Sequence, residues 1–382
     1  MHMTYHVFGA FDRFNYGDIL FSRIVDDLLS ERSDNPARYY YSVSSSDLRP
    51  FGGIVTKPIK SFDRNSVSSS DLIFVAGGDV LTADWPTLIG HSSGYTYYNF
   101  LRIIRKIFGE RYAGKFAGKL YGSDLDFPFV ISPDDFTSQP DVIYNAVGAS
   151  GFMNNPGSSL FSEIIHKLSR ATSISVRDAQ AFAFLKDRGV AVTLRPDSAS
   201  SMSLMYDMKF LSQHRPVVLP SRYVVVQCAL YLGKSEIENI MRRAVALGKE
   251  RGAKIVLLPI GTAPAHDDDK FLRELKSRFS DINVDAVLLP QMHIFQIMAT
   301  IAGASAYAGS SLHGAITSLS YGVPAAALVP NGVSKLTAYL NTWAVPDFQI
   351  EELTFYKPRD YENGGSMPEL AMADLRAHLG LA

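Results

Sequence analysis

Residues 71–79 read DLIFVAGGD, an apolar run followed by a glycine turn. Apolar runs of this kind are typical of strands that are buried on both faces of a parallel sheet. Glycine at the strand end lets the backbone approach a ligand closely. Nearer the N-terminus, residues 5–10 predict another strand, and the apolar residues after Asp18 recur at helical spacing. A strand, a loop and a helix in this order indicate a βαβ unit of a parallel sheet.

The same alternation of strands and helices continues along the rest of the chain. In the first half, the apolar pattern predicts strands at residues 142–147, 172–176 and 190–194, with helices at 158–170 and 179–188. In the second half it predicts strands at 223–228, 254–259, 284–289, 304–308 and 325–329, alternating with helices near 235–251, 268–279, 294–302, 312–321 and 334–340. This order predicts an α/β fold of two doubly wound, Rossmann-like domains.

The length of the chain, 382 residues, also favours two domains, because one hydrophobic core rarely organises so many. We expect residues 1–200 to form the N-terminal domain and residues 222–345 the C-terminal one, joined by an irregular linker at 201–221. Residues 85–139 lack a clear βα rhythm and predict an insertion in the N-terminal domain. Residues 346–382 are expected to form a tail that ends in an amphipathic helix packed back across one of the domains.

Composition excludes several classes of protein. Hydrophobic residues make up 47% and charged residues 20% of the chain, which excludes extensive disorder. The 37 Lys and Arg residues balance the 38 Asp and Glu residues, so no overall field attracts nucleic acid, and none is expected as a partner. The single cysteine, Cys228, excludes a disulfide or a cysteine-based zinc site within one chain. No signal sequence or membrane-spanning run is apparent, so we expect a cytoplasmic protein.

Candidate ligand-binding residues follow the predicted strands, since open parallel sheets bind ligands beyond the carboxyl ends of their strands. Four turns at such places are rich in glycine and polar residues: FNYGD at 14–18, GGD at 77–79, SVRD at 175–178 and GSSLHG at 309–314. In the last turn, Ser310 or Ser311 is placed to cap the following helix, and His313 and the first-turn amides would face a ligand. An anion fits such a site.

Each turn also has a purely structural interpretation. Asn15 and Asp18 are common turn and cap residues, and a Gly77-Gly78 pair is common where a strand ends. Arg177 could pair with a surface carboxylate, and a single histidine at a helix N-terminus is more often structural than catalytic. The occurrence of all four turns at strand ends, in both halves of the chain, favours the functional interpretation.

Taken together, the turns resemble those of the polysaccharide pyruvyltransferase family. The matching motifs are NYGD at 15–18, GGD at 77–79, SVRD at 175–178, PD at 196–197, SLHG at 311–314 and GVP at 322–324. The resemblance implies a glycosyltransferase-B-like pair of Rossmann-type domains, with the acceptor on the N-terminal side and the donor on the C-terminal side. It also implies an enzyme that transfers pyruvate from phosphoenolpyruvate onto a sugar of a surface polysaccharide or exopolysaccharide as a ketal, without a metal or a cofactor.

The family motifs also imply roles for single residues. Arg177, His313 and Lys335 match the residues that hold phosphoenolpyruvate, and His313 is the first candidate for proton transfer, since histidine changes charge near neutral pH. Asp18 is a candidate base that faces the sugar. Neighbouring positions complete the two sites: Ser310, Ser311 and Gly314 on the donor side, and Asn15, Gly77, Gly78 and Asp79 on the acceptor side.

The sequence departs from the family pattern in two places. Ser311 stands where the family has an arginine before Leu-His-Gly, and Asp79 replaces the third glycine of a Gly-Gly-Gly turn. The first departure removes a cation from the donor site, and we expect Arg195, just past a neighbouring strand, to supply the missing charge. Two other functions remain open: a glycosyltransferase of the same architecture that uses a nucleotide sugar, and a family member with lost or altered donor chemistry.

The insertion combines a local positive charge with an amphipathic pattern. Phe100, Ile104, Ile107 and Phe108 share a helical face, and the basic residues near them are Arg102, Arg105, Lys106, Arg111, Lys115 and Lys119. These features support the hypothesis that residues 97–121 rest on the inner face of the membrane, as a peripheral contact, and bring the site to a lipid-linked sugar. The alternative is a helix that only covers the N-terminal domain.

Overall fold

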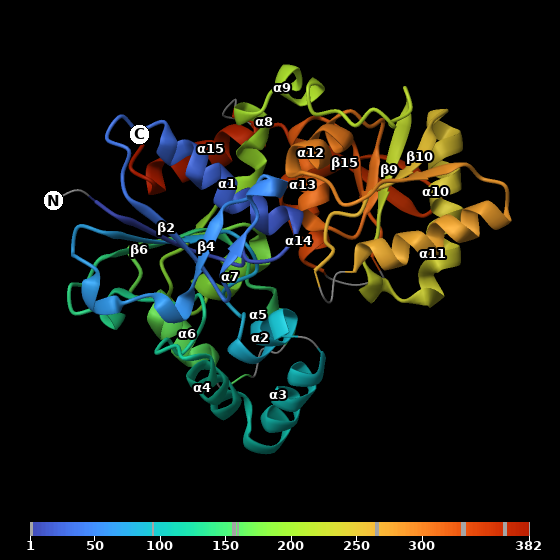
Figure 1. The fold of residues 1–382 in the computed structure, drawn as a ribbon. Helices are drawn as coiled ribbons and strands as arrows, with labels where there is room; N and C mark the ends of the chain where they lie inside the picture. Colours follow the sequence, from blue (N-terminus) through green and yellow to red (C-terminus); the bar gives the residue numbers. More distant parts are fainter. Residues whose placement is uncertain are drawn as a thin grey trace.

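A computed structural model gives the structure of the chain, and it describes residues 3–93, 95–154, 158, 160–263, 267–329, 334–361 and 365–381. Two α/β halves, each built around one sheet, lie beside each other (Figure 1). In the colours of the figure, the N-terminal half runs from blue to green and the C-terminal half from yellow to orange.

The N-terminal sheet has the strand order β3-β4-β2-β1-β5-β6-β7-β8. Its strands are β1 (Tyr5–Phe8), β2 (Arg38–Ser42), β3 (Ser46–Asp47), β4 (Val55–Pro58), β5 (Leu72–Ala76), β6 (Asp141–Val147), β7 (Ser173–Val176) and β8 (Thr193–Leu194). All neighbours pair in parallel except β3 and β4. β5 is buried along its whole length, as its apolar sequence predicts.

Helices connect these strands and form the predicted insertion. The connecting helices are α1 (Tyr16–Ser30), α5 (Ser150–Asn154), α6 (Phe161–Leu168) and α7 (Ala179–Lys186). The insertion between β5 and β6 contains α2 (Trp85–Ser93), α3 (Tyr95–Phe108) and α4 (Glu110–Tyr121), which Figure 1 shows together at one end of the N-terminal half. No helix among the described residues is long and apolar enough to cross a bilayer.

The C-terminal sheet has the strand order β11-β10-β9-β12-β13-β15-β14. Its strands are β9 (Tyr223–Gln227), β10 (Lys254–Leu257), β11 (Ala286–Leu288), β12 (Tyr307–Gly309), β13 (Ala325–Ala327), β14 (Ala344–Ile350) and β15 (Leu353–Pro358). The helices that alternate with them are α10 (Ile237–Arg251), α11 (Asp268–Asp281), α12 (Ile294–Ala302), α13 (Leu312–Ser320) and α14 (Lys335–Trp343). The strands pair in parallel as far as β13, and β15 pairs antiparallel with both β13 and β14.

The chain crosses between the halves twice. Residues 195–222 carry it from β8 to β9 and include α8 (Met202–Met205) and α9 (Met208–Ser212). The last helix, α15 (Met367–His378), returns to the N-terminal half, where it packs on α8 and β6. The hydroxyl of Tyr5 donates to the carbonyl of Leu379 at 2.8 Å, and Figure 1 shows α15, in red, beside α1.

The predicted α/β fold, with two Rossmann-like domains in a glycosyltransferase-B-like arrangement, is confirmed. With β3 left aside, the first five strands of each sheet follow the doubly wound order 3-2-1-4-5. The strands β2, β3, β4, β14 and β15 were not predicted. Residues from 346 onward were expected to form only a tail, but β14 and β15 extend the C-terminal sheet. β14 tolerates Pro346 because an edge strand needs no N–H donor on its outer side.

Candidate active site

A cavity of about 210 Å³ lies between the two halves, next to the carboxyl ends of their strands. Its polar lining consists of Arg13, Asn15, Asp18, Asp79, Arg177, Gln227, Asp268, Ser310, Ser311, His313 and Lys335. The strand order of each sheet reverses between β1 and β5 and between β9 and β12, which is where doubly wound sheets bind ligands. Among the described residues, no three His, Cys, Asp or Glu side chains lie close enough together to hold a metal ion.

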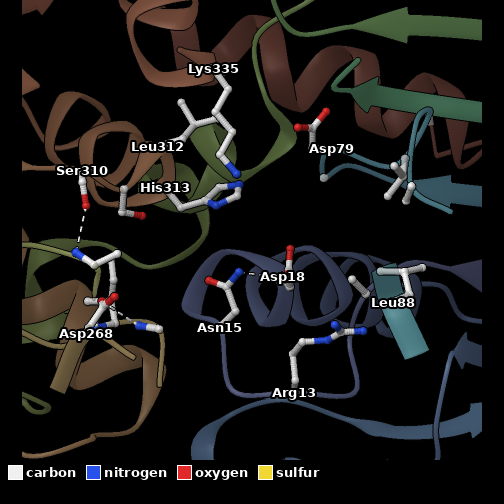
Figure 2. A pocket seen from close by; sticks show the side chains of 18 of the residues that line it. Arg13, Asn15, Asp18, Asp79, Leu88, Asp268, Ser310, Leu312, His313 and Lys335 are labelled. Atoms are coloured by element: carbon white, nitrogen blue, oxygen red, sulfur yellow. Dashed lines mark hydrogen bonds between the residues drawn. The ribbon is translucent and has the colours of Figure 1, made fainter. Parts of the chain in front are cut away.

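The loop after β1 carries Asn15 and Asp18 to the cavity. Tyr16 fastens this loop to the C-terminal half: its N–H donates to the carbonyl of Ile260 at 2.9 Å, and its hydroxyl bonds to that of Thr317 at 3.0 Å. Asn15 occupies the N-cap position of α1, but its side chain makes no capping bond. Its amide nitrogen donates to Asp18 at 2.9 Å instead, so the two side chains line the cavity as a hydrogen-bonded pair (Figure 2).

His313 reaches the cavity from the first turn of α13, in the C-terminal half. Its ring packs edge-on against Phe21 of α1, with the ring centres 5.1 Å apart. A Cβ atom on Gly17 would lie 1.8 Å from Nδ1 of His313, so only glycine allows the ring this position. The glycine of the NYGD motif thus lets α1 and α13, from opposite halves, meet at the cavity.

Asp197 joins Arg177 to His313. The guanidinium of Arg177 donates to the Asp197 carboxylate at 2.9 Å, and both side chains are almost fully buried. Nε2 of His313 lies 3.8 Å from the same carboxylate oxygen, too far for a hydrogen bond, and has no hydrogen-bond partner among the described residues. Burial opposes the charge of Asp197, but His313 and Arg177 hold its pKa below the ordinary value. We call these three residues the Asp197 cluster.

Lys335 and Asp79 lie on the side of the cavity next to this cluster. Lys335 is the first residue of α14, and Trp343 at the far end of that helix donates to the carbonyl of Arg177 at 2.7 Å. Burial works against the charge of Asp79, but Lys335 and Arg177 outweigh it and lower the pKa of Asp79. Asp79 was expected on the acceptor side. It lines the cavity on the same side as Lys335 (Figure 2), and both Lys335 and Arg177, which were expected to hold the donor, act on its charge.

Arg13 lines the cavity but was not predicted. Its guanidinium pairs with Asp12 at 2.9 Å, and Asp12 also accepts the hydroxyl of Ser44 at 2.7 Å. The paired side chain is mostly buried and reaches the cavity from the loop after β1. The strand-end rule that pointed to Asn15 could have found Arg13 as well, because the two residues share this loop.

Asp268, the first residue of α11, was also not predicted. Its Oδ2 accepts the N–H groups of Ile260 and Gly261 at 3.0 Å each and the side-chain amide of Gln227 at 2.8 Å. Its Oδ1 is buried and has no hydrogen-bond partner among the described residues. Burial raises the pKa of Asp268 to about 6, and the hydrogen bonds offset only part of this effect. A carboxyl group that titrates near neutral pH thus lines the cavity, outside every predicted motif.

The turn before α13 is fixed by the same glutamine. Oε1 of Gln227 accepts the N–H of Ser310 at 3.0 Å and that of Ser311 at 2.8 Å. Ser311 is the N-cap of α13, which confirms one of the two predicted caps, and it accepts the N–H of Gly314. Gly314 is not part of the cavity lining, and a Cβ atom there would meet the hydroxyl of Tyr307 at 2.1 Å. Gly314 therefore serves the packing of α13.

Gly77 and Arg195 also lie outside the cavity lining, whereas Gly78 is part of it. Gly77 has a left-handed backbone with φ of 52°, and a Cβ atom there would lie 2.3 Å from the ring of Phe21. The side chain of Arg195 is 45% exposed and pairs with Asp374 of α15 at 3.3 Å. Arg195 was expected to supply a cation to the donor site, but its guanidinium pairs with Asp374 and is not part of the cavity lining.

Comparisons relate the chain to known proteins. A family model described as polysaccharide pyruvyl transferase matches residues 15–332. No curated protein matches the chain significantly. The UDP-GlcNAc 2-epimerase of Methanocaldococcus jannaschii, solved with UDP-GlcNAc and UDP, is 11% identical, with 86% of this chain and 84% of that chain covered and a TM-score of 0.45. The Neisseria meningitidis UDP-GlcNAc 2-epimerase is 11% identical, with 89% of this chain and 85% of that chain covered and a TM-score of 0.47. The Rickettsia bellii UDP-N-acetylglucosamine 2-epimerase is 10% identical, with 100% of this chain and 96% of that chain covered and a TM-score of 0.48.

Proposed function

The chain belongs to the polysaccharide pyruvyl transferase family, and we propose that it transfers pyruvate from phosphoenolpyruvate onto a sugar as a ketal. The acceptor would be a sugar of a surface polysaccharide or exopolysaccharide, or of its precursor. One observation carries the proposal: Arg177, His313 and Lys335, which stand in three separate segments of the chain, line the same cavity between the halves.

The donor would be held by charge-assisted hydrogen bonds to its phosphate and carboxylate groups. The lysine and arginine side chains that line the cavity are Arg13, Arg177 and Lys335. Asp197 balances the charge of Arg177, and Asp12 balances that of Arg13, whereas Lys335 is exposed at the start of α14. We infer that Lys335 binds the phosphate and that Arg13, in place of Arg195, adds the cation that a serine at position 311 removes.

Ketal formation needs a proton on the methylene carbon of the donor and takes protons from two sugar hydroxyls. Each hydroxyl oxygen forms a bond to the central carbon of pyruvate, and the bond from that carbon to the phosphate oxygen breaks. One of the two protons is matched by the proton added to the methylene carbon, and the other leaves with the phosphate. We assign protonation of the methylene carbon to His313, because its ring lines the cavity and its Nε2 is buried beside the Asp197 carboxylate. The Asp197 carboxylate, 3.8 Å away, would stabilise the charged imidazole. Asp18, paired with Asn15 on the facing wall, is our candidate for the base.

Phosphate release from phosphoenolpyruvate, measured with a panel of sugar acceptors, tests the proposal. We expect phosphate and a ketal methyl signal in the proton NMR spectrum to appear together with at least one acceptor. His313→Ala should abolish both signals, whereas His378→Gln, a change outside the cavity lining, should abolish neither. Transfer from a uridine or guanosine diphosphate sugar, with no phosphate released from phosphoenolpyruvate, would contradict the proposal and favour a nucleotide-sugar glycosyltransferase.

A further inference from the structure

The insertion exposes a row of large apolar side chains on α3 and α4. Ile103, Ile107, Phe108 and Tyr112 are between 55% and 65% exposed. The ring centres of Phe108 and Tyr112 are 5.1 Å apart, and those of Tyr112 and Phe116 are 6.4 Å apart with nearly parallel planes. We call these five residues the apolar row. A contiguous exposed surface of this kind marks an interaction site rather than ordinary protein surface.

The opposite side of α4 attaches the insertion to the rest of the N-terminal half. There α4 buries only small residues, Ala113, Ala117 and Gly118, and Gly118 packs against the ring of Trp85. Among the side chains of α3 that the structure describes, none is buried. Phe116 and Tyr121 of α4 are partly buried and pack against the core of the N-terminal half, so α4 covers that half in part. The side chains of Ile103, Ile107, Phe108 and Tyr112 are more than half exposed, and a covering role does not explain them.

Basic residues are frequent in the insertion, although Arg105 is paired with Asp84 and Glu110. Residues 97–121 contain six Lys and Arg residues and one Glu, a net charge of +5 in a chain whose net charge is −1. Arg111, Lys115 and Lys119 line a groove together with Phe108, Tyr112 and Phe116. Arg111 lies 3.3 Å from Glu163 and Lys115 lies 3.8 Å from Asp126, but the side chains of both cations are at least half exposed. Apolar and aromatic side chains flanked by Lys and Arg match the chemistry of an anionic bilayer surface.

We propose that the apolar row and its flanking cations dock on an anionic membrane surface, and that the acceptor is a sugar carried by a membrane lipid. The second part rests on the proposed function. The insertion also reaches the cavity, because Leu88 of α2 is part of the cavity lining and α2 packs against both α3 and α4. A second copy of the chain fits this face less well, since the exposed Arg111, Lys115 and Lys119 of two copies would repel each other.

Vesicle sedimentation tests the docking. The probes are vesicles of phosphatidylcholine alone and of phosphatidylcholine mixed with phosphatidylglycerol. We expect binding to the mixed vesicles only, and its loss at high salt. Lys115→Gln combined with Lys119→Gln should weaken binding about thirtyfold, because each basic residue near such a surface contributes about 1 kcal/mol. Ile107→Glu combined with Phe108→Glu should abolish it.

The matched control is Val217→Glu combined with Val218→Glu, which changes two exposed apolar residues outside the insertion. This variant should bind like the unaltered protein, and all variants should keep the same melting temperature because the changed side chains are exposed. Three results would each overturn the docking. The protein does not bind the mixed vesicles, the variants of the apolar row still bind them, or the protein is a dimer that dissociates when the row is changed. Vesicle binding needs neither donor nor sugar, so its failure and a failure of phosphate release are distinguishable.

Discussion

Two clusters of an arginine, an aspartate and a histidine begin at the carboxyl ends of neighbouring strands, one inside the cavity and one outside it. The first is the Asp197 cluster. The second, which we call the Asp374 cluster, consists of Arg195, Asp374 and His378, with Asp374 lying 3.3 Å from Arg195 and 3.5 Å from His378. Arg177 and Arg195 directly follow the parallel strands β7 and β8, so the two clusters start from equivalent places in the sheet.

The histidines of the two clusters differ in their hydrogen bonds. Both ring nitrogens of His378 have partners, since Nδ1 lies 3.0 Å from the amide of Asn145 and Nε2 lies 2.9 Å from the hydroxyl of Ser173. Nε2 of His313 has none among the described residues, and its ring lines the cavity. The same residue types thus fasten α15 to the sheet in the Asp374 cluster, whereas in the Asp197 cluster they hold a histidine ring at the cavity with a buried nitrogen that has no hydrogen-bond partner among the described residues.

The largest expected effect is a difference in kcat between variants of the two histidines. His313→Ala should lower kcat by roughly 100- to 10,000-fold, the usual contribution of a proton-transferring side chain. His378→Ala should keep kcat within a few-fold but lose about 1–3 kcal/mol of stability, because Asn145 and Ser173 lose their partner. Steady-state kinetics and urea unfolding of both variants check this contrast. A wild-type rate in His313→Ala would remove that residue from the chemistry.

Replacing the two arginines should change the stability of the protein by different amounts. Arg177→Ala leaves the fully buried Asp197 without its ion-pair partner, so we expect a loss of about 3–5 kcal/mol in the free energy of unfolding. Arg195→Ala breaks a partly exposed pair and should lose about 1 kcal/mol or less. Urea unfolding measures both. The double variant Arg177→Ala with Asp197→Ala should regain part of the stability that Arg177→Ala loses. Equal losses in Arg177→Ala and Arg195→Ala would contradict the distinction between the two clusters.

Asp268 also lines the cavity, but it belongs to neither the Asp197 cluster nor the Asp374 cluster. Its pKa is about 6 in the folded protein and 3.8 ordinarily, so the folded state binds the proton more tightly than the unfolded state does. Its contribution to stability is therefore fully present below about pH 4 and is lost as the pH rises to about 6. Asp268→Asn should match the parent at pH 4 and exceed it by about 3 kcal/mol at pH 7. Equal unfolding curves at both pH values would place the pKa of Asp268 near its ordinary value.

Lys335 tests whether the cavity cations hold the donor. Lys335→Ala should weaken phosphoenolpyruvate binding about 10- to 100-fold, since a hydrogen bond to a charged group contributes about 1.5–3 kcal/mol. Its melting temperature should fall slightly, because the exposed Lys335 helps to hold the charge of the buried Asp79. Lys357→Ala, on β15, is the matched control and should bind the donor like the parent. Titration calorimetry measures the affinities, and unchanged binding in Lys335→Ala would remove this residue from the donor site.

The smallest expected effect concerns the position where the family has an arginine. Ser311→Arg should tighten phosphoenolpyruvate binding about tenfold, since a guanidinium there could pair with the phosphate beside His313. Arg195→Ala should leave the affinity unchanged, because that side chain lies outside the cavity lining. Calorimetry on both variants and the parent provides the measurement. If none of the three binds millimolar phosphoenolpyruvate, the donor is a different molecule.

The local sequence was enough to predict most of the fold and part of the cavity. Apolar runs and glycine turns gave the strands next to Gly78 and Arg177, and capping placed His313 in the first turn of a helix. These features depend on residues a few positions apart, which is why one sequence predicts them. The edge strand β14 and its neighbour β15 escaped prediction. In β14, Pro346 indicates the end of a strand unless its outer side is known to be open.

Which side chains meet was decided by the tertiary structure. Arg177 and Arg195 occupy equivalent places after parallel strands, yet Asp197 keeps the first at the cavity, while Asp374, 179 residues further along the chain, holds the second outside it. The hydrogen bonds of Asp268 likewise depend on a distant residue. Gln227, 41 residues away, donates to its Oδ2, whereas its Oδ1 has no partner among the described residues. Such contacts depend on how the two halves and α15 pack, and the periodicity of a single segment contains no information about that packing.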